Sequence, residues 1–228
     1  MKMQILDTSE FLSNNKFRFM IYGKSGIGKT QLISTVKGRI LILNTDKGLS
    51  TLRKFQCQYV SANTWPEILE FLNFIKTKEC QESYDWIVFD SVTALSDILY
   101  NHLIDDKKLS GFDLWREYGN FMSKFLRFIR DQNTYHTVSI FEAIDKEDAS
   151  GVTVQVFGVQ GQIGSKVPNF YDEVFAMKMI VQNKEPKRML QTLTTLGWIA
   201  KDRSKALEAL EEPDLNVIME KIINGGKK

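Results

Sequence analysis

Short apolar runs alternate along the chain with longer stretches in which apolar residues recur at helical spacing. The clearest helical stretch covers 114–131, which carries one apolar face. Runs rich in apolar, β-branched or aromatic residues predict strands at 17–22, 40–43, 86–90, 137–141 and 174–181. This alternation predicts an α/β fold with a mostly parallel central sheet that helices flank on both faces.

The last third of the chain has a different pattern. Residues 188–194 and 197–202 read as strands on either side of a tight turn at 195–197. We expect them to form antiparallel edge strands at the C-terminal side of the sheet. Pro213 then interrupts the chain before a short predicted helix at 216–223.

The length of the chain, 228 residues, fits a single domain. We expect that domain to cover 16–224 and a frayed tail to cover 225–228. The N-terminal residues 1–15 predict an arm, which either contacts a neighbouring subunit or adds an edge strand. Hydrophobic residues at 43% and charged residues at 25% are typical of an ordinary globular protein.

Charge and cysteine content narrow the class of protein further. The net charge of +2 is too small to draw the whole molecule onto a polyanion. Cys57 and Cys80 lack metal-ligand spacing, and His102 and His136 are the two histidines that could join them. The sequence therefore does not predict a metal site built from Cys and His. Two free thiols and the absence of an apolar leader predict that the protein is located in the cytoplasm. The apolar runs are too short to predict a membrane-spanning helix.

A phosphate-binding motif stands between a predicted strand and a helix-compatible segment. Residues 23–30 read GKSGIGKT, which matches G-x-x-x-x-G-K-[ST]. Glycines let such a loop turn its N–H groups toward phosphate oxygens, so the pattern predicts ATP as the cofactor. Lys29 would reach the β- and γ-phosphates, and Thr30 would bind Mg²⁺. The expected nucleotide-binding residues are Gly23, Lys24, Ser25, Gly26, Ile27, Gly28, Lys29, Thr30 and Gln31.

Acidic residues follow three predicted strands at what should be one edge of the sheet. Asp90, at the end of YDWIVFD, predicts the second protein anchor for Mg²⁺. Asp46 follows the strand ILIL and is either the residue that orients the attacking water or a turn-forming Asp. Glu142 follows TVSIF and is either a sensor of the γ-phosphate or a satisfied strand-end carboxylate.

Taken in order, these segments resemble the RecA-like ATPases carried by bacteriophages, a group that includes phage nucleotide-binding and single-strand-annealing proteins. The resemblance covers about 16–222. It rests on the segments GKSGIGKT, NTDKGL, YDWIVFDS, REYGNFMSKFLRFIR, GQIGSKVPNFYDEVF and LGWIAKDRS. It implies a RecA-like P-loop NTPase fold.

The resemblance also assigns catalytic positions. The usual catalytic acid of RecA-like proteins is Glu, and Asp46 stands at that position here, which leaves the hydrolysis rate open. Lys201 and Arg203 resemble a K-x-R element that related hexameric ATPases extend into the neighbouring subunit's nucleotide. Residues that are two positions apart in a strand lie on the same face, so both cations can point at one phosphate. Surface cations on an edge strand are the alternative.

Two segments are candidates for contact with DNA. The resemblance implies a mobile loop after Glu142 and a second contact around Gly161, Gly164 and Lys166, although carboxylates in the first loop oppose phosphate binding. A helix-capping turn is the alternative for the second segment. The helix at 114–131 also carries a basic stripe, for which a solvated helix face is the alternative. The stripe consists of Arg116, Lys124, Arg127 and Arg130.

The sequence therefore predicts a Mg²⁺-dependent ATPase of a bacteriophage that acts in DNA recombination or single-strand annealing in the cytoplasm of the bacterial host. The expected partners are single-stranded DNA, further copies of the chain in a ring or filament, and phage replication or recombination proteins, with no membrane. Two other functions stay open: an ATP-dependent protein-interaction switch with little turnover, and a replicative helicase-like motor.

Overall fold

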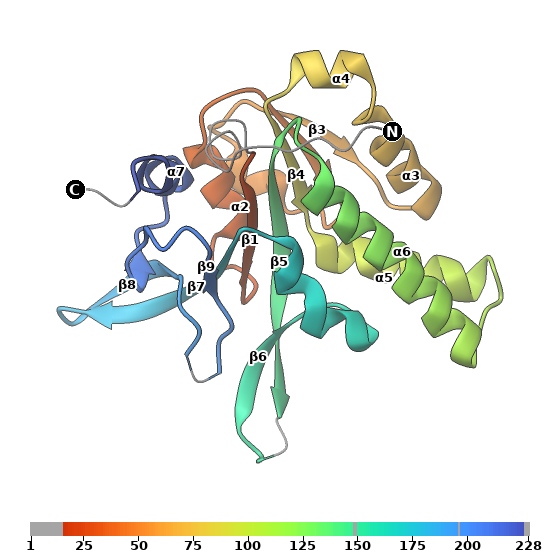
Figure 1. Ribbon diagram of the computed structural model, residues 1–228. Helices are drawn as coiled ribbons and strands as arrows, with labels where there is room; N and C mark the ends of the chain where they lie inside the picture. Colours follow the sequence, from red (N-terminus) through yellow and green to blue (C-terminus); the bar gives the residue numbers. More distant parts are fainter. Residues whose placement is uncertain (1–15, 148–149, 196, 226–228) are drawn as a thin grey trace, which may run out of the picture.

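The computed structural model describes residues 16–147, 150–195 and 197–225 (Figure 1). The predicted arm at 1–15 and most of the predicted tail lie outside the described residues. The strands are β1 (Arg18–Gly23), β2 (Ile40–Asn44), β3 (Gln58–Ser61), β4 (Trp86–Asp90), β5 (His136–Glu147), β6 (Thr153–Phe157), β7 (Glu173–Gln182), β8 (Glu185–Gln191), β9 (Lys201–Asp202) and β10 (Leu210–Glu211).

Helices connect and cover these strands. The α-helices are α2 (Lys29–Leu32), α3 (Trp65–Phe74), α4 (Lys78–Ser83), α5 (Val92–Asp105), α6 (Gly111–Asp131) and α7 (Leu215–Ile223). Short 3₁₀ helices are η1 (Ile33–Thr35), η2 (Leu49–Leu52) and η3 (Gly161–Phe170). The predicted helix at 114–131 is confirmed and begins three residues earlier, at Gly111 after Ser110.

The sheet has the strand order β10-β8-β7-β1-β5-β4-β2-β3. The six strands from β7 to β3 run parallel to their neighbours, whereas β8 and β10 are antiparallel. The expected α/β fold with antiparallel C-terminal edge strands is therefore confirmed. Strands β1, β2 and β4 are buried along their whole length because helices cover both faces of the sheet.

Alternate residues of each central strand pack into two separate cores. Met20 and Tyr22 of β1 face the core under α3, α5 and α6. Phe19 and Ile21 face the opposite core, which contains residues of α2, η1 and α7. Figure 1 shows these two helical layers on opposite sides of the sheet. Because these strands are parallel, their carboxyl ends all lie at one edge of the sheet, which is where ligands of open α/β sheets bind.

The predicted strands at 188–194 and 197–202 were wrong in extent, although Thr195 and Trp198 form an antiparallel bridge across the expected turn. The antiparallel hairpin is formed by β7 and β8, and its turn is at Asn183 and Lys184, whose φ angles are 53° and 67°. Two consecutive left-handed residues are the geometry of a tight hairpin turn. After the expected turn, the strand covers only Lys201–Asp202. The N–H and the carbonyl of Ile199 bind the hydroxyl of Tyr22, so they do not pair with a neighbouring strand.

The loop expected after Glu142 was also wrong. Strand β5 continues to Glu147 and pairs with β6 in an antiparallel hairpin that extends beyond the sheet (Figure 1). Ile144 and Val152 are exposed on this hairpin. Sequence reasoning read the charged residues here as a loop, but a strand that leaves the core exposes both faces and so tolerates them.

His136 gives the fold a dependence on pH. Its ring stacks on Trp86 and Phe17, and its Nδ1 accepts the Phe17 N–H at 3.1 Å. Burial lowers the pKa of His136 to about 4, with the Lys16 charge in the same direction and Asp85 opposing it. The unfolded chain therefore binds more protons than the folded chain between about pH 6.5 and pH 4, and stability falls as the pH falls through that range.

We expect the free energy of unfolding to drop by up to about 3 kcal/mol between pH 7 and pH 4 on account of this residue. His136→Asn keeps a hydrogen-bond acceptor but does not titrate, so it should remove that part of the pH dependence. Urea unfolding of both proteins at the two pH values checks this, and an unchanged difference in the variant would contradict it.

Candidate nucleotide-binding site

The loop at 23–30 connects the end of β1 to α2, as its motif predicts. Gly23 approaches β7 so closely that a Cβ atom would lie 2.5 Å from the carbonyl oxygen of Met177. Gly28 has a φ of 102°, in the left-handed region that favours glycine, and directly precedes α2. A buried strand, a tight turn and a helix N-terminus are together the structure that binds phosphate groups through backbone N–H groups.

The ammonium group of Lys29 folds back over the loop. Its Nζ donates to the carbonyl oxygens of Gly23 at 2.8 Å and Lys24 at 3.0 Å. Burial lowers the pKa of Lys29, and the charges of Glu142, Asp90 and Asp46 oppose that shift. The three carboxylates predicted from separate strands therefore all act electrostatically on the lysine of the loop.

Thr30 and Asp90 meet at the predicted magnesium site. The Thr30 hydroxyl donates to Oδ2 of Asp90 at 2.8 Å, and Asp90 is 1% exposed. Its Oδ1 has no hydrogen-bond partner among the described residues. Burial, followed by the Asp46 charge, raises the pKa of Asp90 to about 7. An oxygen-only donor pair with one unused buried oxygen suits Mg²⁺, so these two residues fit that ion.

Asp46 forms the turn that one of its two sequence interpretations predicts, and it also lies at the edge of the sheet where the other interpretation places it. Its Oδ1 accepts the N–H of Gly48 at 2.9 Å, as in a turn-forming Asp. It is also exposed at the carboxyl end of β2, where its charge acts on Asp90 and Lys29. Thr45 fixes that end, because its hydroxyl donates to the Ser91 carbonyl at 2.8 Å and accepts the Ser91 N–H at 2.9 Å. The peptide between Asp90 and Ser91 is cis.

Glu142 lies beside the loop, in register with Gly23 across the β1–β5 pair. Its N–H donates to the Thr93 hydroxyl at 3.0 Å, which ties β5 to α5. Three residues further along, the charged hairpin contacts the loop directly: Lys24 Nζ and Asp145 Oδ2 are 2.6 Å apart. The structure thus brings Glu142 to the phosphate loop and joins the loop to the β5–β6 hairpin.

Lys201 and Arg203 lie at the other end of the sheet. Strand β9 pairs with β7 at Glu173, which is the end of β7 beside Phe19 rather than Gly23. The Lys201 ammonium donates to the carbonyl oxygens of Pro168 and Tyr171, at 3.1 and 2.6 Å. Arg203 pairs with Asp172 at 2.7 Å and keeps 54% of its side chain exposed. Neither cation belongs to the nucleotide site of its own chain.

Sequence reasoning missed Thr45, Thr93 and Arg188. The first two support Asp90 and Glu142, and Arg188 contacts the loop at Gly28. None of them belongs to a motif, and each reaches the site from a distant part of the chain.

No described helix is long and apolar enough to cross a membrane.

Comparison with known proteins places this chain in a family. A family model described as an AAA domain matches residues 15–204. No curated protein matches the sequence. Among solved structures, flagellar accessory protein FlaH from Methanocaldococcus jannaschii is similar, with 11% identity and a TM-score of 0.43 over 85% of this chain and 86% of that chain. A KaiC-like protein from Pyrococcus horikoshii is similar with 13% identity and a TM-score of 0.45 over 76% of each chain. Because the AAA model spans most of the sequence, this chain belongs to the AAA domain family and is a P-loop NTPase.

Proposed function

We propose that the protein binds and hydrolyses ATP with Mg²⁺ and acts on single-stranded DNA in phage recombination or strand annealing. The ATPase half rests on one observation: the Thr30 hydroxyl meets a buried Asp90 that has an unpartnered oxygen, beside the loop ammonium of Lys29. Mg²⁺ bound there would neutralise phosphate charge. Thr30 and Asp90 would hold it, and Lys29 would turn from the loop carbonyls to the phosphates.

The remaining carboxylates have separate roles in this proposal. Asp46 is exposed at the strand end and would orient the attacking water and accept its proton. Glu142 lies next to the loop in register and would respond to the γ-phosphate at the base of the β5–β6 hairpin. ATP binding would in this way alter the position of the hairpin.

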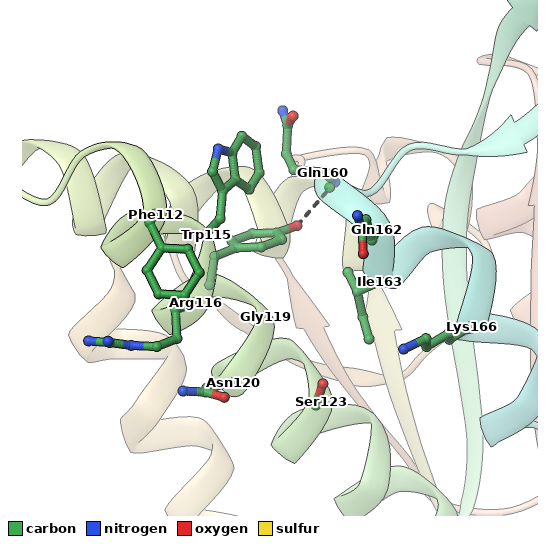
Figure 2. A pocket seen from close by; sticks show the side chains of 12 residues that line it. Phe112, Trp115, Arg116, Gly119, Asn120, Ser123, Gln160, Gln162, Ile163 and Lys166 are labelled. Carbon is green, nitrogen blue, oxygen red and sulfur yellow. Dashed lines mark hydrogen bonds between the residues drawn. The ribbon is translucent and has the colours of Figure 1, made fainter.

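The DNA half is supported by a hollow of about 680 Å³ between α6 and η3 (Figure 2). Phe112 and Trp115 are 78% and 43% exposed on its α6 side. None of the described residues that line it is a carboxylate. Exposed aromatic rings beside cations are the features that bind single strands, because bases stack on the rings and phosphates pair with the cations. The cations and amides that line it are Arg116, Lys166, Asn120, Gln160 and Gln162.

Two contacts join the walls of this hollow. The Tyr118 hydroxyl accepts the Gln160 N–H at 3.1 Å, which joins the two walls (Figure 2). Gly161, with a φ of 67°, lets the Trp115 ring approach closely, since a Cβ atom would lie 3.2 Å from it. The basic stripe predicted on α6 is partly neutralised, because Arg116 pairs with Asp113 and Arg130 pairs with Asp131. Arg116 also lines the hollow, so we favour the hollow over the stripe because of its exposed aromatic rings and Lys166.

We expect Trp115→Ala to weaken single-strand binding about 5- to 100-fold, the loss typical of one base–aromatic stack. Fluorescence anisotropy with a labelled single strand, at several salt concentrations and with ATP and Mg²⁺, measures this. Tyr59→Ala is the matched control, since Tyr59 is 58% exposed on the edge strand β3. Phosphate release should rise with single-stranded DNA in the native protein and rise less in the Trp115 variant.

Equal affinity of the Trp115 variant and the native protein would remove the hollow from the proposal. No binding by the native protein at low salt would remove the DNA half altogether.

Oligomerisation is also part of the proposal, because Arg203 lies at the far end of the sheet from its own loop and is half exposed. An arginine in that position can serve a neighbouring subunit's nucleotide. We expect Lys29→Met and Arg203→Ala each to be inactive alone and a mixture of the two to recover part of the phosphate release. Some interfaces in the mixture combine an intact loop with an intact arginine. No recovery in assembled mixtures would contradict the role of Arg203 in trans.

A nucleotide-dependent switch with little turnover is the second candidate. The observation that favours it is the Lys24–Asp145 ion pair, since it links the loop to the exposed hairpin. The side chain of Asp46, which is shorter than the Glu usual at this position, also favours the switch. Tight ATP binding with negligible phosphate release, with or without DNA, would favour the switch over the DNA-stimulated ATPase.

A further inference from the structure

Arg188 lies against the phosphate loop from a strand that no motif connects to it. Strand β7 extends past the end of β1, with Ala176 in register with Tyr22, and β8 returns beside it so that Arg188 pairs with Met179. Arg188 therefore stands beyond the end of β1, at the level of the loop. It shares a face of β8 with Leu190, which packs in the core under α2 and α7.

The guanidinium group packs on Gly28. A Cβ atom on Gly28 would lie 2.6 Å from Nη1 and 2.7 Å from Cζ of Arg188. The φ of 102° favours glycine at this position, and the arginine occupies the space beside it. The guanidinium is held within contact of the part of the loop where the backbone N–H groups turn toward phosphate.

The same guanidinium has no partner of opposite charge in the part of the chain that the structure describes. Its Nε is buried and has no hydrogen-bond partner among the described residues. No ion pair joins Arg188 to a described carboxylate, whereas its neighbour Lys187 pairs with Glu212. A buried donor without an acceptor is costly, and arginine donors in proteins are satisfied by planar or multiple oxygen acceptors. A phosphate group on the loop would supply such oxygens.

We propose that Arg188 binds the α- and β-phosphates of the nucleotide held by its own chain. Gly28 belongs to the part of such loops that surrounds these two phosphates, while the lysine reaches toward the γ-phosphate. Arg188 would act together with Lys29, and independently of Arg203 in a neighbouring subunit. This inference rests on the nucleotide binding proposed above and adds a residue to it.

Isothermal titration calorimetry with Mg·ADP and Mg·ATP tests the role of Arg188. Arg188→Met keeps an apolar stem and removes the fork, and it should weaken both nucleotides roughly 10- to 100-fold. Arg188→Lys keeps a charge but not the fork and should fall between Arg188→Met and the native protein. Lys187→Met is the matched control one residue away, on the other face of β8, and should bind as the native protein does.

The affinity for ADP distinguishes this role from others. A loss confined to ATP would place Arg188 at the γ-phosphate and overturn the proposal. Unchanged affinity would overturn it too, as would tighter binding, because Arg188 would then compete with the phosphates for the loop. Thermal unfolding without ligand shows whether each variant is folded. Should Arg188→Met not fold, Arg188→Lys decides, and unchanged affinity for ADP in that variant overturns the proposal.

The experiment also separates failure of this inference from failure of the proposed function. If the native protein binds neither nucleotide, the nucleotide site itself is wrong, and Arg188 has no phosphate to bind. If the native protein and the Arg188 variants bind both nucleotides equally well, the proposed function stands and the role of Arg188 is wrong.

Discussion

Lys29→Met is expected to reduce phosphate release from ATP roughly 10²- to 10³-fold, the loss seen when one preorganised donor to a transition-state charge is removed. Lys29 is the ammonium at the centre of the site, with the charges of Glu142, Asp90 and Asp46 acting on it. Methionine keeps the length of the apolar stem, so packing of the loop should be preserved. Burial already lowers the pKa of Lys29, which means that the charge is costly in the ligand-free chain.

Steady-state phosphate release at saturating Mg·ATP measures the effect, and thermal unfolding without ligand should show little change. Lys37→Met is the control, because Lys37 carries an exposed charge whose nearest carboxylate is Glu220 at 3.9 Å. Native-like turnover in Lys29→Met would mean that the loop does not carry the reaction. Loss of turnover together with loss of the folded state would make the lysine structural instead.

Asp90→Asn should separate activity from stability. We expect hydrolysis to fall by a similar factor of roughly 10² or more, since the variant lacks the anionic ligand for Mg²⁺. We also expect the ligand-free variant to be at least as stable as the native protein at pH 8. Asp90 is 1% exposed and has an unpartnered oxygen, and burial and the Asp46 charge both oppose its ionised form. A neutral amide of the same shape avoids that cost and still accepts from Thr30.

Two measurements check the Asp90 prediction: the thermal midpoint without ligand, and phosphate release over a range of Mg²⁺ concentrations. Thr30→Val provides the matched comparison, because it removes the other proposed magnesium ligand and leaves Asp90 in place. A marked fall in the midpoint of Asp90→Asn would show that the carboxylate supports the fold. Undiminished hydrolysis at low Mg²⁺ would remove Asp90 from the metal site.

The predictable part of the site was local in sequence. The loop at 23–30 depends on glycines, a lysine and a threonine at fixed spacing, between a strand and a helix that the apolar pattern also shows. Asp90 could be found because it ends a wholly apolar strand, and parallel strands bring such ends to one edge. The hairpins were harder, since the outer parts of β5 and β8 carry charges like those of loops.

The sequence by itself thus determined the phosphate loop, its lysine, its threonine and the aspartate that faces them, because each lies in a short pattern of spacing or period. Only the tertiary structure decided that β1 lies between β5 and β7, which places Glu142 beside Gly23 and brings Arg188 against Gly28. It also placed Arg203 at the opposite end of the sheet. The physical reason is that strand order depends on how whole faces are buried together, and residues more than a hundred positions apart carry no local signal of becoming neighbours.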